Sequence, residues 1–297
     1  SKRLHLGIIS AAPSYQLSLT PEEESTQQKV NYKPNILALA GYRLTFLGLT
    51  VSYLQDVLRK PEDDEKFGKT SYEDIRLSTF LGKEDQWYIN FYYTRYKGLY
   101  IDNSEEIDTA LTDNDPKIYN EDLEIFNFGS AILYVFDANE YSVAAPYSQT
   151  AQQKDSGGSW LMRLSVDSSL IQDDSPIIPT QVRLLYGSDQ NLVKARFIST
   201  ILQGGYGYSL VWNNFYINLQ GLVGVGVQNR DWTNENEAAL SSLTNISKWS
   251  IWASVGYNSE NFFVTLRQQN DETKYETKSI NIFSNLSWWQ IDLGVRF

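Results

Sequence analysis

Six charged side chains fall on the polar faces of segments in which polar and apolar residues alternate. Arg offers a fixed fork of N–H donors that fits carboxylate and phosphate, so four arginines against two aspartates indicate a site for small anionic or zwitterionic solutes. The alternative is that the arginines and aspartates pair with one another and form a structural plug. The six residues are Asp74, Arg76, Arg163, Arg267, Asp292 and Arg296.

A second group of polar and aromatic side chains follows one segment of the chain. Amphipathic rings beside cations can stack a sugar or bind a lipid headgroup, so this group is a candidate ligand-binding site. The alternative is an aromatic girdle whose cations reach the membrane interface. The members of the group are Tyr88, Asn90, Tyr92, Arg95, Lys97 and Tyr100.

Residues for nucleophilic or metal chemistry are scarce. A serine-rich loop contains Ser148, Lys154, Ser156 and Ser159. It could be a Ser/Lys nucleophile pair, but serine-rich turns are common and we favour a purely structural loop. The chain has one His, His5, and no Cys. A Ser-His-Asp site or a zinc site is hard to build from this set, so we predict no catalytic residue, no metal ligand and no cofactor.

The chain is acidic, with a net charge of −11. Because such a chain could not neutralise a row of phosphates, we exclude nucleic acid as a partner. Acidic runs at residues 62–65, 105–108 and 113–115 could bridge divalent cations to lipopolysaccharide phosphates through oxygen ligands. Their spacing is irregular, and a solvated, repulsive surface explains them more simply.

The elements that position these side chains follow from strict alternation, which is clearest in residues 288–297. One face of this segment is apolar and ends on Phe297, while the other face is polar or Gly. Strands of about 9–11 residues with aromatic ends predict an antiparallel transmembrane β-barrel with a polar lumen. A run of about 18 apolar residues, as a transmembrane helix needs, does not occur. Similar alternation recurs at residues 47–53, 74–81, 87–94, 215–225 and 249–257.

Short and long connections alternate along the chain. If both termini are periplasmic, short turns lie on the periplasmic side and long loops outside. The sequence predicts tight turns near residues 43–45, 82–85, 212–214 and 258–260. It predicts long acidic loops at residues 61–69, 102–122, 171–194, 231–244 and 270–278.

This alternation limits the middle of the chain, where only two of the segments 123–136, 141–151 and 159–167 can span. Residues 127–136 form a continuous apolar run, so we interpret them as a helix or an extended excursion before a strand at Tyr141. The expected count is then about twelve strands. Fourteen is the alternative if residues 278–284 and the excursion both span.

Seven stretches cover most of the chain in order: YKPN (32–35), YTRYKGLYIDN (93–103), YVFD (134–137), SVAAPYSQ (142–149), QKDSGGS (153–159), GGYGY (204–208) and VGYNS (255–259). Together they resemble a family of bacterial outer-membrane proteins, domain of unknown function 4421. Val143 and Asp155 depart from that family, which tends to carry Arg and Lys at these points. The resemblance implies a barrel in Gram-negative outer membranes and implies no activity.

We therefore expect one outer-membrane domain over residues 1–297, a mature chain from Ser1 and a monomer with periplasmic termini. The leading hypothesis is a narrow pore or solute-binding channel for small solutes. The alternatives are a surface enzyme or recognition protein that acts on envelope lipid or glycan, and a plugged structural barrel. Expected partners are outer-membrane lipid, lipopolysaccharide, a small solute and the barrel-assembly machinery, which the last strand and Phe297 would engage.

Overall fold

A computed structural model describes residues 4–22, 28–58 and 61–297. Ser1 and the side chain of Glu62 lie outside the described part of the chain. The fold consists of antiparallel strands with a few short helices between them. The strands are β1 (Leu4–Pro21), β2 (Val30–Lys33), β3 (Ala38–Phe46), β4 (Leu49–Leu58), β5 (Ser71–Leu81), β6 (Trp87–Ile101), β7 (Tyr119–Val135), β8 (Gly157–Gln172), β9 (Leu192–Trp212), β10 (Phe215–Asn234), β11 (Leu240–Asn258), β12 (Phe262–Glu276) and β13 (Ile280–Arg296).

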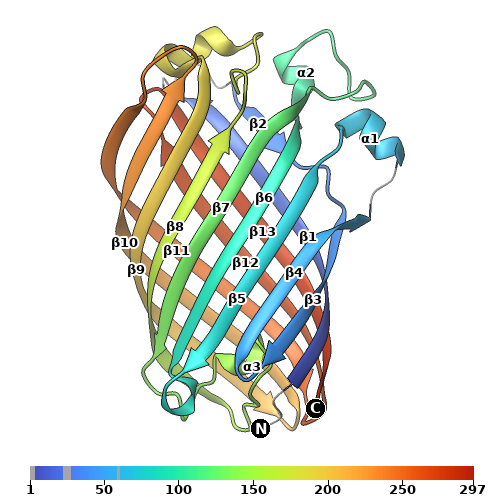
Figure 1. Ribbon diagram of the computed structural model, residues 1–297, viewed down its shortest axis with the longest axis vertical. Coiled ribbons are helices and arrows are strands. Elements are labelled where there is room, and N and C mark those ends of the chain that lie inside the picture. The colour runs from blue at the N-terminus through green and yellow to red at the C-terminus, as the bar shows by residue number, and fades with distance from the viewer. Residues whose placement is uncertain (1–3, 23–27, 59–60) are drawn as a thin grey trace.

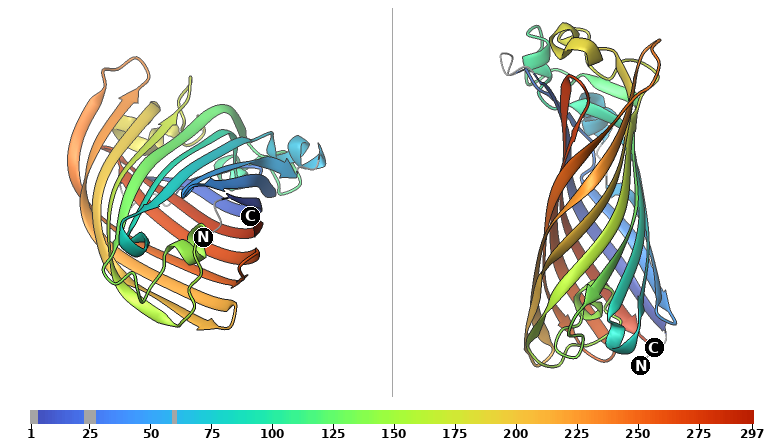
Figure 2. Two further views of the ribbon diagram at one scale, coloured as in Figure 1. Left: turned by 60° about the horizontal axis from the view of Figure 1, so that its bottom comes forward. Right: turned by 90° about the vertical axis from the view of Figure 1, so that its left-hand side faces the viewer.

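Twelve of these strands close into a ring, which makes the fold an up-and-down β-barrel (Figures 1 and 2). Each strand from β3 to β13 pairs with the next along the chain, and β1 closes the ring by pairing with both β3 and β13. The short strand β2 bridges β1 and β6 at one end, where β3, β4 and β5 do not reach. The predicted fold class is confirmed.

The two ends of the barrel are built differently. β1 begins and β13 ends at what we call the terminal end, where most connections are short (Figure 1). The loop end, opposite, carries α1 (Pro61–Phe67), α2 (Ser104–Ile107) and the 3-10 segment η2 (Arg183–Asp189). At the terminal end, η1 (Lys83–Asp85) and α3 (Ala144–Tyr147) interrupt the connections. The connection that contains α3, residues 136–156, is the long one there.

The outer face of the barrel is apolar. Val223 and Val225 of β10 are 68% and 69% exposed, whereas Gln220 and Gln228 of the same strand point inward and are buried. Trp residues lie on this outer face near the terminal end, among them Trp160 at the start of β8. Apolar strands with aromatic ends are the surface that a membrane barrel presents to lipid. Within the described residues, no helix is long and apolar enough to cross a membrane.

The predicted count of twelve is met by different segments than expected. Residues 127–136 are not an excursion but the second half of the spanning strand β7, and residues 141–151 do not span. The prediction of an excursion was wrong because the lumen face of β7 is also apolar here. Leu133 and Val135 pack on Tyr141 and Val143 of the α3 connection. Residues 278–284 belong largely to β13, so the fourteen-strand alternative is wrong.

Other predicted connections also shift. The turn expected at residues 43–45 lies at Leu47 and Gly48, which take the positive φ values of 50° and 86° that a tight hairpin turn requires. The loops expected at residues 231–244 and 270–278 are largely strand, because β10 to β13 extend toward the loop end. The turns near residues 82–85, 212–214 and 258–260 lie where they were predicted.

Candidate functional site

The α3 connection folds back into the lumen at the terminal end of the barrel and occupies part of it. Its apolar first half is held by Tyr141, whose hydroxyl accepts hydrogen bonds from Asn218 (2.7 Å) and Gln220 (2.6 Å) of β10. Its second half, from Tyr147 to Gln149, is polar. We call residues 141–149 the plug, because their side chains are buried in the barrel apart from the partly buried Ser142 and Tyr147.

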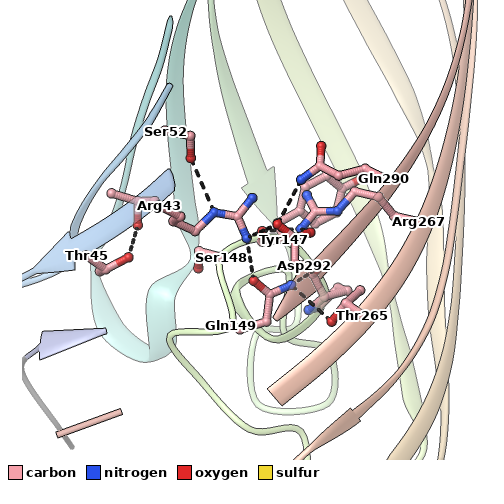
Figure 3. A network of polar contacts seen from close by, with 12 residues as sticks. Arg43, Thr45, Ser52, Tyr147, Ser148, Gln149, Thr265, Arg267, Gln290 and Asp292 are labelled. Carbon is pink, nitrogen blue, oxygen red and sulfur yellow. Dashed lines mark hydrogen bonds and ion pairs between the residues drawn. The ribbon is translucent and has the colours of Figure 1, made fainter. Parts of the chain in front are cut away.

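Gln149 ties the plug to three strands (Figure 3). Its side-chain oxygen accepts a hydrogen bond from Arg43 Nη1 (2.7 Å), and its amide donates to Thr265 Oγ1 (3.3 Å). Its carbonyl accepts from Arg296 Nε at 2.8 Å. Gln149 has a φ of 54°, a conformation that costs a non-Gly residue free energy and persists where surrounding contacts hold it.

Asp292 is the centre of the charge network beside the plug (Figure 3). It is 1% exposed and accepts from Arg43 Nη1 at 2.9 Å, Arg267 Nη2 at 2.6 Å and Gln290 Nε2 at 2.8 Å. Arg267 Nη2 also donates to the carbonyl of Tyr147 at 2.9 Å. The same buried carboxylate therefore orients Arg43 and Arg267, two of the three arginines that bind the plug.

Above the plug lies a cavity of about 230 Å³, which we call the chamber. Five cationic side chains line it, together with the carboxylates of Asp167 and Asp271 and a set of aromatic rings. Residues from strands on all sides of the barrel contribute, because alternation points every second side chain inward. The cations are Arg43, Arg76, Arg163, Lys248 and Arg267.

Most of these cations are paired. Arg76 binds the fully buried Asp74 through two nitrogens, at 2.9 and 2.8 Å, and its guanidinium lies 5.0 Å from the ring of Trp288. Lys248 lies 3.2 Å from Asp271. Arg163 has no carboxylate within ion-pair distance in the described part of the chain, and its guanidinium lies over the ring of Trp252 at 5.1 Å.

Aromatic rings form the side of the chamber that faces the loop end. Tyr15 stacks on Tyr96 with 4.7 Å between ring centroids, and Phe197 stacks on Tyr275 at 4.4 Å. Together with Tyr72, which also packs on Tyr96, they come from strands on several sides of the lumen.

Beyond this layer, the connection between β8 and β9 (residues 173–191) covers the lumen with Ile177, Ile178, Val182 and Tyr186, all buried. We call this connection the lid. The Tyr186 hydroxyl donates to the carbonyl of Leu19 at 3.0 Å, and burial raises the pKa of this phenol.

The predicted charged residues all lie where alternation placed them. The pair of Arg267 with Asp292 is present, and Arg296 points inward near the terminal end. Arg296 contributes to the plug, donating to Gln149 and to Asn258 Oδ1, rather than to Asp292. Asp74 and Arg76 pair with each other.

The second predicted group does not come together. Tyr88, Asn90 and Tyr92 line the chamber, and the Tyr92 hydroxyl donates to Asp167 at 2.8 Å. Arg95 and Lys97 lie on the outer face of β6, where Arg95 pairs with Glu124 of β7 and Lys97 lies 3.4 Å from Asp122.

Tyr100 packs on Phe67 of α1 at the loop end. The predicted group divides between the two faces of β6 because neighbouring residues of a strand point to opposite faces. The cations on the outer face match the girdle alternative.

The serine-rich loop also gains a structural explanation. Ser148 donates to the carbonyl of Ala144 at 3.1 Å, Ser156 accepts from the Val211 amide at 2.8 Å, and Ser159 accepts from the Asp137 amide at 2.8 Å. No hydrogen bond joins Lys154 to a serine in the part of the chain that is described, and Lys154 is exposed. His5 is buried beside the plug. These hydroxyls shape the connection.

Sequence reasoning missed several residues of the site. Arg43 was assigned to a turn, although it alternates with the outward-facing Tyr42 and Leu44, and this alternation was the available signal. Asp167 and Lys248 were likewise readable from alternation. Gln149 carried no signal, because nothing in a loop sequence indicates that the loop enters a lumen.

The chain resembles several solved structures distantly. The outer membrane protease OmpT from Escherichia coli is 9% identical with a TM-score of 0.38, covering 99% of this chain and 97% of that one. The Pseudomonas putida toluene transporter TodX is 6% identical with a TM-score of 0.33, covering 100% and 91%. The attachment invasion locus protein Ail of Yersinia pestis is 9% identical with a TM-score of 0.25, covering all of both chains.

No curated protein shows significant sequence similarity to this chain. The distant structural similarities assign no activity to it. One family model, in contrast, matches the sequence over its whole length, residues 1–297. The chain therefore belongs to the family described as Domain of unknown function (DUF4421).

Proposed function

We propose that this protein is a gated outer-membrane channel that binds small anionic or zwitterionic solutes in its chamber. The observation that carries the proposal is a cation-rich cavity in the lumen with a plug on one side and a lid on the other. A barrel whose only role is structural has no need of a cavity lined by five cations. A permanently open pore would have no plug.

The plug is the part that opens. From Tyr147 to Gln149 it is held by hydrogen bonds, three of them from Arg43, Arg267 and Arg296. A bond to a charged group contributes a net of about 1.5–3 kcal/mol and a bond between neutral groups about 0.5–1.5 kcal/mol. The lid buries large apolar side chains, and the burial of each one stabilises the closed lid by about 1.5–3 kcal/mol. Displacing the polar half of the plug returns its hydrogen-bonding groups to water, whereas lifting the lid would expose apolar side chains, and Gln149 gains a relaxed backbone when it leaves.

The proposed setting is the outer membrane of a Gram-negative cell, with the terminal end in the periplasm. The short connections at that end and the longer ones opposite support this orientation. The β13 strand with Phe297 would engage the assembly machinery. The outer cations Arg95 and Lys97 would lie at the level of lipopolysaccharide headgroups.

Planar-bilayer recording tests the proposal. The unmodified barrel should show rare, small, anion-preferring current steps, because the plug closes it most of the time. Gln149→Ala removes the contacts to Arg43 and Thr265 and should raise the open fraction at least about tenfold, since two hydrogen bonds are lost. Arg76→Ala should reduce the preference for anions.

Lys154→Ala is the matched control, because Lys154 belongs to the same connection but is exposed. It should leave the currents unchanged. A variant with residues 138–155 replaced by a short Gly-Ser linker separates the remaining alternative. If that variant folds, as judged by heat-modifiable migration in SDS gels, and is still silent, the barrel is structural and the proposal is wrong.

A further inference from the structure

The charges around the chamber do not cancel. Besides Asp167 and Asp271, the buried carboxylates of Asp74 and Asp292 lie against the lining arginines, which brings the carboxylates to four against five cations. One positive charge is left over. Among the described residues, Arg163 is the one lining cation that has no carboxylate within ion-pair distance, whereas Arg43 and Arg267 share Asp292 and Asp167 bonds to Tyr92 and Ser165.

Two further N–H groups near Arg163 are buried without a hydrogen-bond partner. They are the indole Nε1 of Trp252 and the Nε of Arg267. Leaving such a donor unpaired costs about 1–3 kcal/mol, more for a charged group, so each needs an explanation. Ser254 lies opposite Arg267 in the β11–β12 register, and Trp252 is the next inward residue of β11. Trp252 and Arg267 therefore lie on neighbouring strands, on one side of the chamber.

Aromatic rings surround these donors. Tyr147 packs edge-on against Trp252 with 5.8 Å between ring centroids, and Tyr88 packs on Tyr147 at 5.9 Å. The Arg267 guanidinium lies 5.9 Å from the ring of Tyr147. A ligand held by the donors would place its body against these rings.

The volume of the chamber limits the size of the ligand. A cavity of about 150 Å³ in another protein holds one benzene molecule. A chamber of about 230 Å³ has room for one ring and a short acidic side chain, but not for a disaccharide.

We propose that the chamber is a binding site for a small monoanionic carboxylate that carries an aromatic or alicyclic ring. The inference rests on the proposed solute-binding function and names its ligand class. The carboxylate is bound by the Arg163 guanidinium, the Trp252 indole N–H and the Arg267 Nε–H, and the ring packs on Tyr88 and Tyr147. One ligand charge cancels the leftover positive charge.

Asp167 argues against an α-amino acid as the ligand. It lies four residues from Arg163 on β8, about 13 Å along the strand at 3.3 Å per residue. The ammonium and carboxylate of an α-amino acid are adjacent, whereas the Asp167 carboxylate is set apart along the strand and both of its oxygens already accept hydrogen bonds. Asp167 is instead hydrogen-bonded to Tyr92 and Ser165.

Equilibrium dialysis of the full-length barrel in lipid nanodiscs tests the ligand class, because equilibrium does not depend on how slowly the plug opens. The probes are 3-phenylpropionate, its neutral alcohol 3-phenylpropanol, the zwitterion phenylalanine and the cation phenethylamine. We expect 3-phenylpropionate to bind at least about tenfold more tightly than the other three, which corresponds to one charge-assisted hydrogen bond.

Substitutions of the proposed donors test which residues bind the carboxylate. Arg163→Gln should weaken 3-phenylpropionate binding at least about tenfold and leave 3-phenylpropanol unchanged. Trp252→Phe, which keeps a ring and removes the N–H, should weaken it about threefold to tenfold. Arg196→Gln is the control and should change nothing, because Arg196 lies on the outer face of β9, paired with Asp231.

Equal affinity for 3-phenylpropanol, tighter binding of phenylalanine, or an unchanged affinity in Arg163→Gln would each overturn the inference. Binding of none of the probes would overturn it as well. The channel proposal would still stand in those cases if Gln149→Ala opens the barrel in bilayers, so the two failures can be told apart.

Discussion

Arg43 of β3 and Asp292 of β13 form an ion pair across an intervening strand, with 2.9 Å between Nη1 and Oδ1. β1 lies between the two strands and presents Gly7 opposite Arg43. A Cβ at Gly7 would lie 3.6 Å from the Arg43 Cβ and 3.1 Å from the carbonyl of Leu293. The small residue leaves room for the guanidinium to pass over β1, so residues 249 positions apart in the chain close the terminal end together.

Asp292→Asn should destabilise the barrel strongly. The substitution leaves the buried Arg43 and Arg267 without their carboxylate, and breaking a buried pair of this kind costs about 3–5 kcal/mol. Urea titration in lipid vesicles, followed by tryptophan fluorescence, measures the free energy of unfolding. Asp231→Asn is the control, because it breaks the exposed pair with Arg196 and should cost less than about 1 kcal/mol. Equal effects of both substitutions would contradict this account of the network.

Ile178→Ala should loosen the lid. Ile178 is fully buried against the loop-end core, and truncating such a side chain costs about 2–5 kcal/mol. Limited proteolysis of the reconstituted barrel should then cut residues 173–191 faster than in the unmodified protein. Leu184→Ala in the same connection is the control, because Leu184 is 86% exposed and its truncation should leave the cleavage rate unchanged. Identical rates for the two variants would show that the lid is not held by its apolar contacts.

Val223→Arg tests the apolar outer face. Val223 lies near the middle of β10 and points outward, where a lipid-facing Arg costs about 2–4 kcal/mol. Leu243→Arg should cost little, because Leu243 is equally exposed but lies near the loop end of β11. Folding yield into vesicles and the urea midpoint report the difference. If Val223→Arg folds as well as Leu243→Arg, the middle of β10 does not face hydrocarbon.

Much of the barrel could be predicted because membrane strands repeat a period of two. β10, β11 and β13 alternate over most of their length, apart from the apolar inward residues Leu222 and Trp252, so most of their inward residues could be assigned from sequence alone. The same rule assigns Arg267 of β12 to the lumen. The pairing of Arg267 with Asp292 followed from that assignment. Alternation also assigns Arg43 to the lumen face. This residue was missed because the turn was predicted four residues before its actual position.

The plug could not be predicted from the same rule. The plug packs its apolar side chains on the lumen face of β7. The second half of β7, which contains Leu133 and Val135, is therefore apolar on both faces and lacks the alternation of a membrane strand. In the plug sequence, Tyr141, Val143, Ala145 and Tyr147 stand at every second position, so this segment resembles a strand. Only the structure, in which the two segments contact each other, shows that β7 is the strand and the plug is the excursion.

The central claim is that a solute reaches the chamber by displacing the plug. Because the chain has no Cys, a single Ser78→Cys variant reports access directly. Ser78 lines the chamber and makes none of the contacts that hold the plug. Ser241→Cys, which is exposed near the loop end, gives the rate of unhindered labelling.

The decisive measurement is the rate at which a small anionic methanethiosulfonate labels Ser78→Cys in lipid nanodiscs, which leave both ends of the barrel accessible. We predict slow labelling in the otherwise unmodified barrel. Adding Gln149→Ala should accelerate it at least about tenfold, while adding Ile178→Ala should change it less. Labelling that is as fast as at Ser241→Cys, or that Gln149→Ala does not accelerate, would contradict the gated channel.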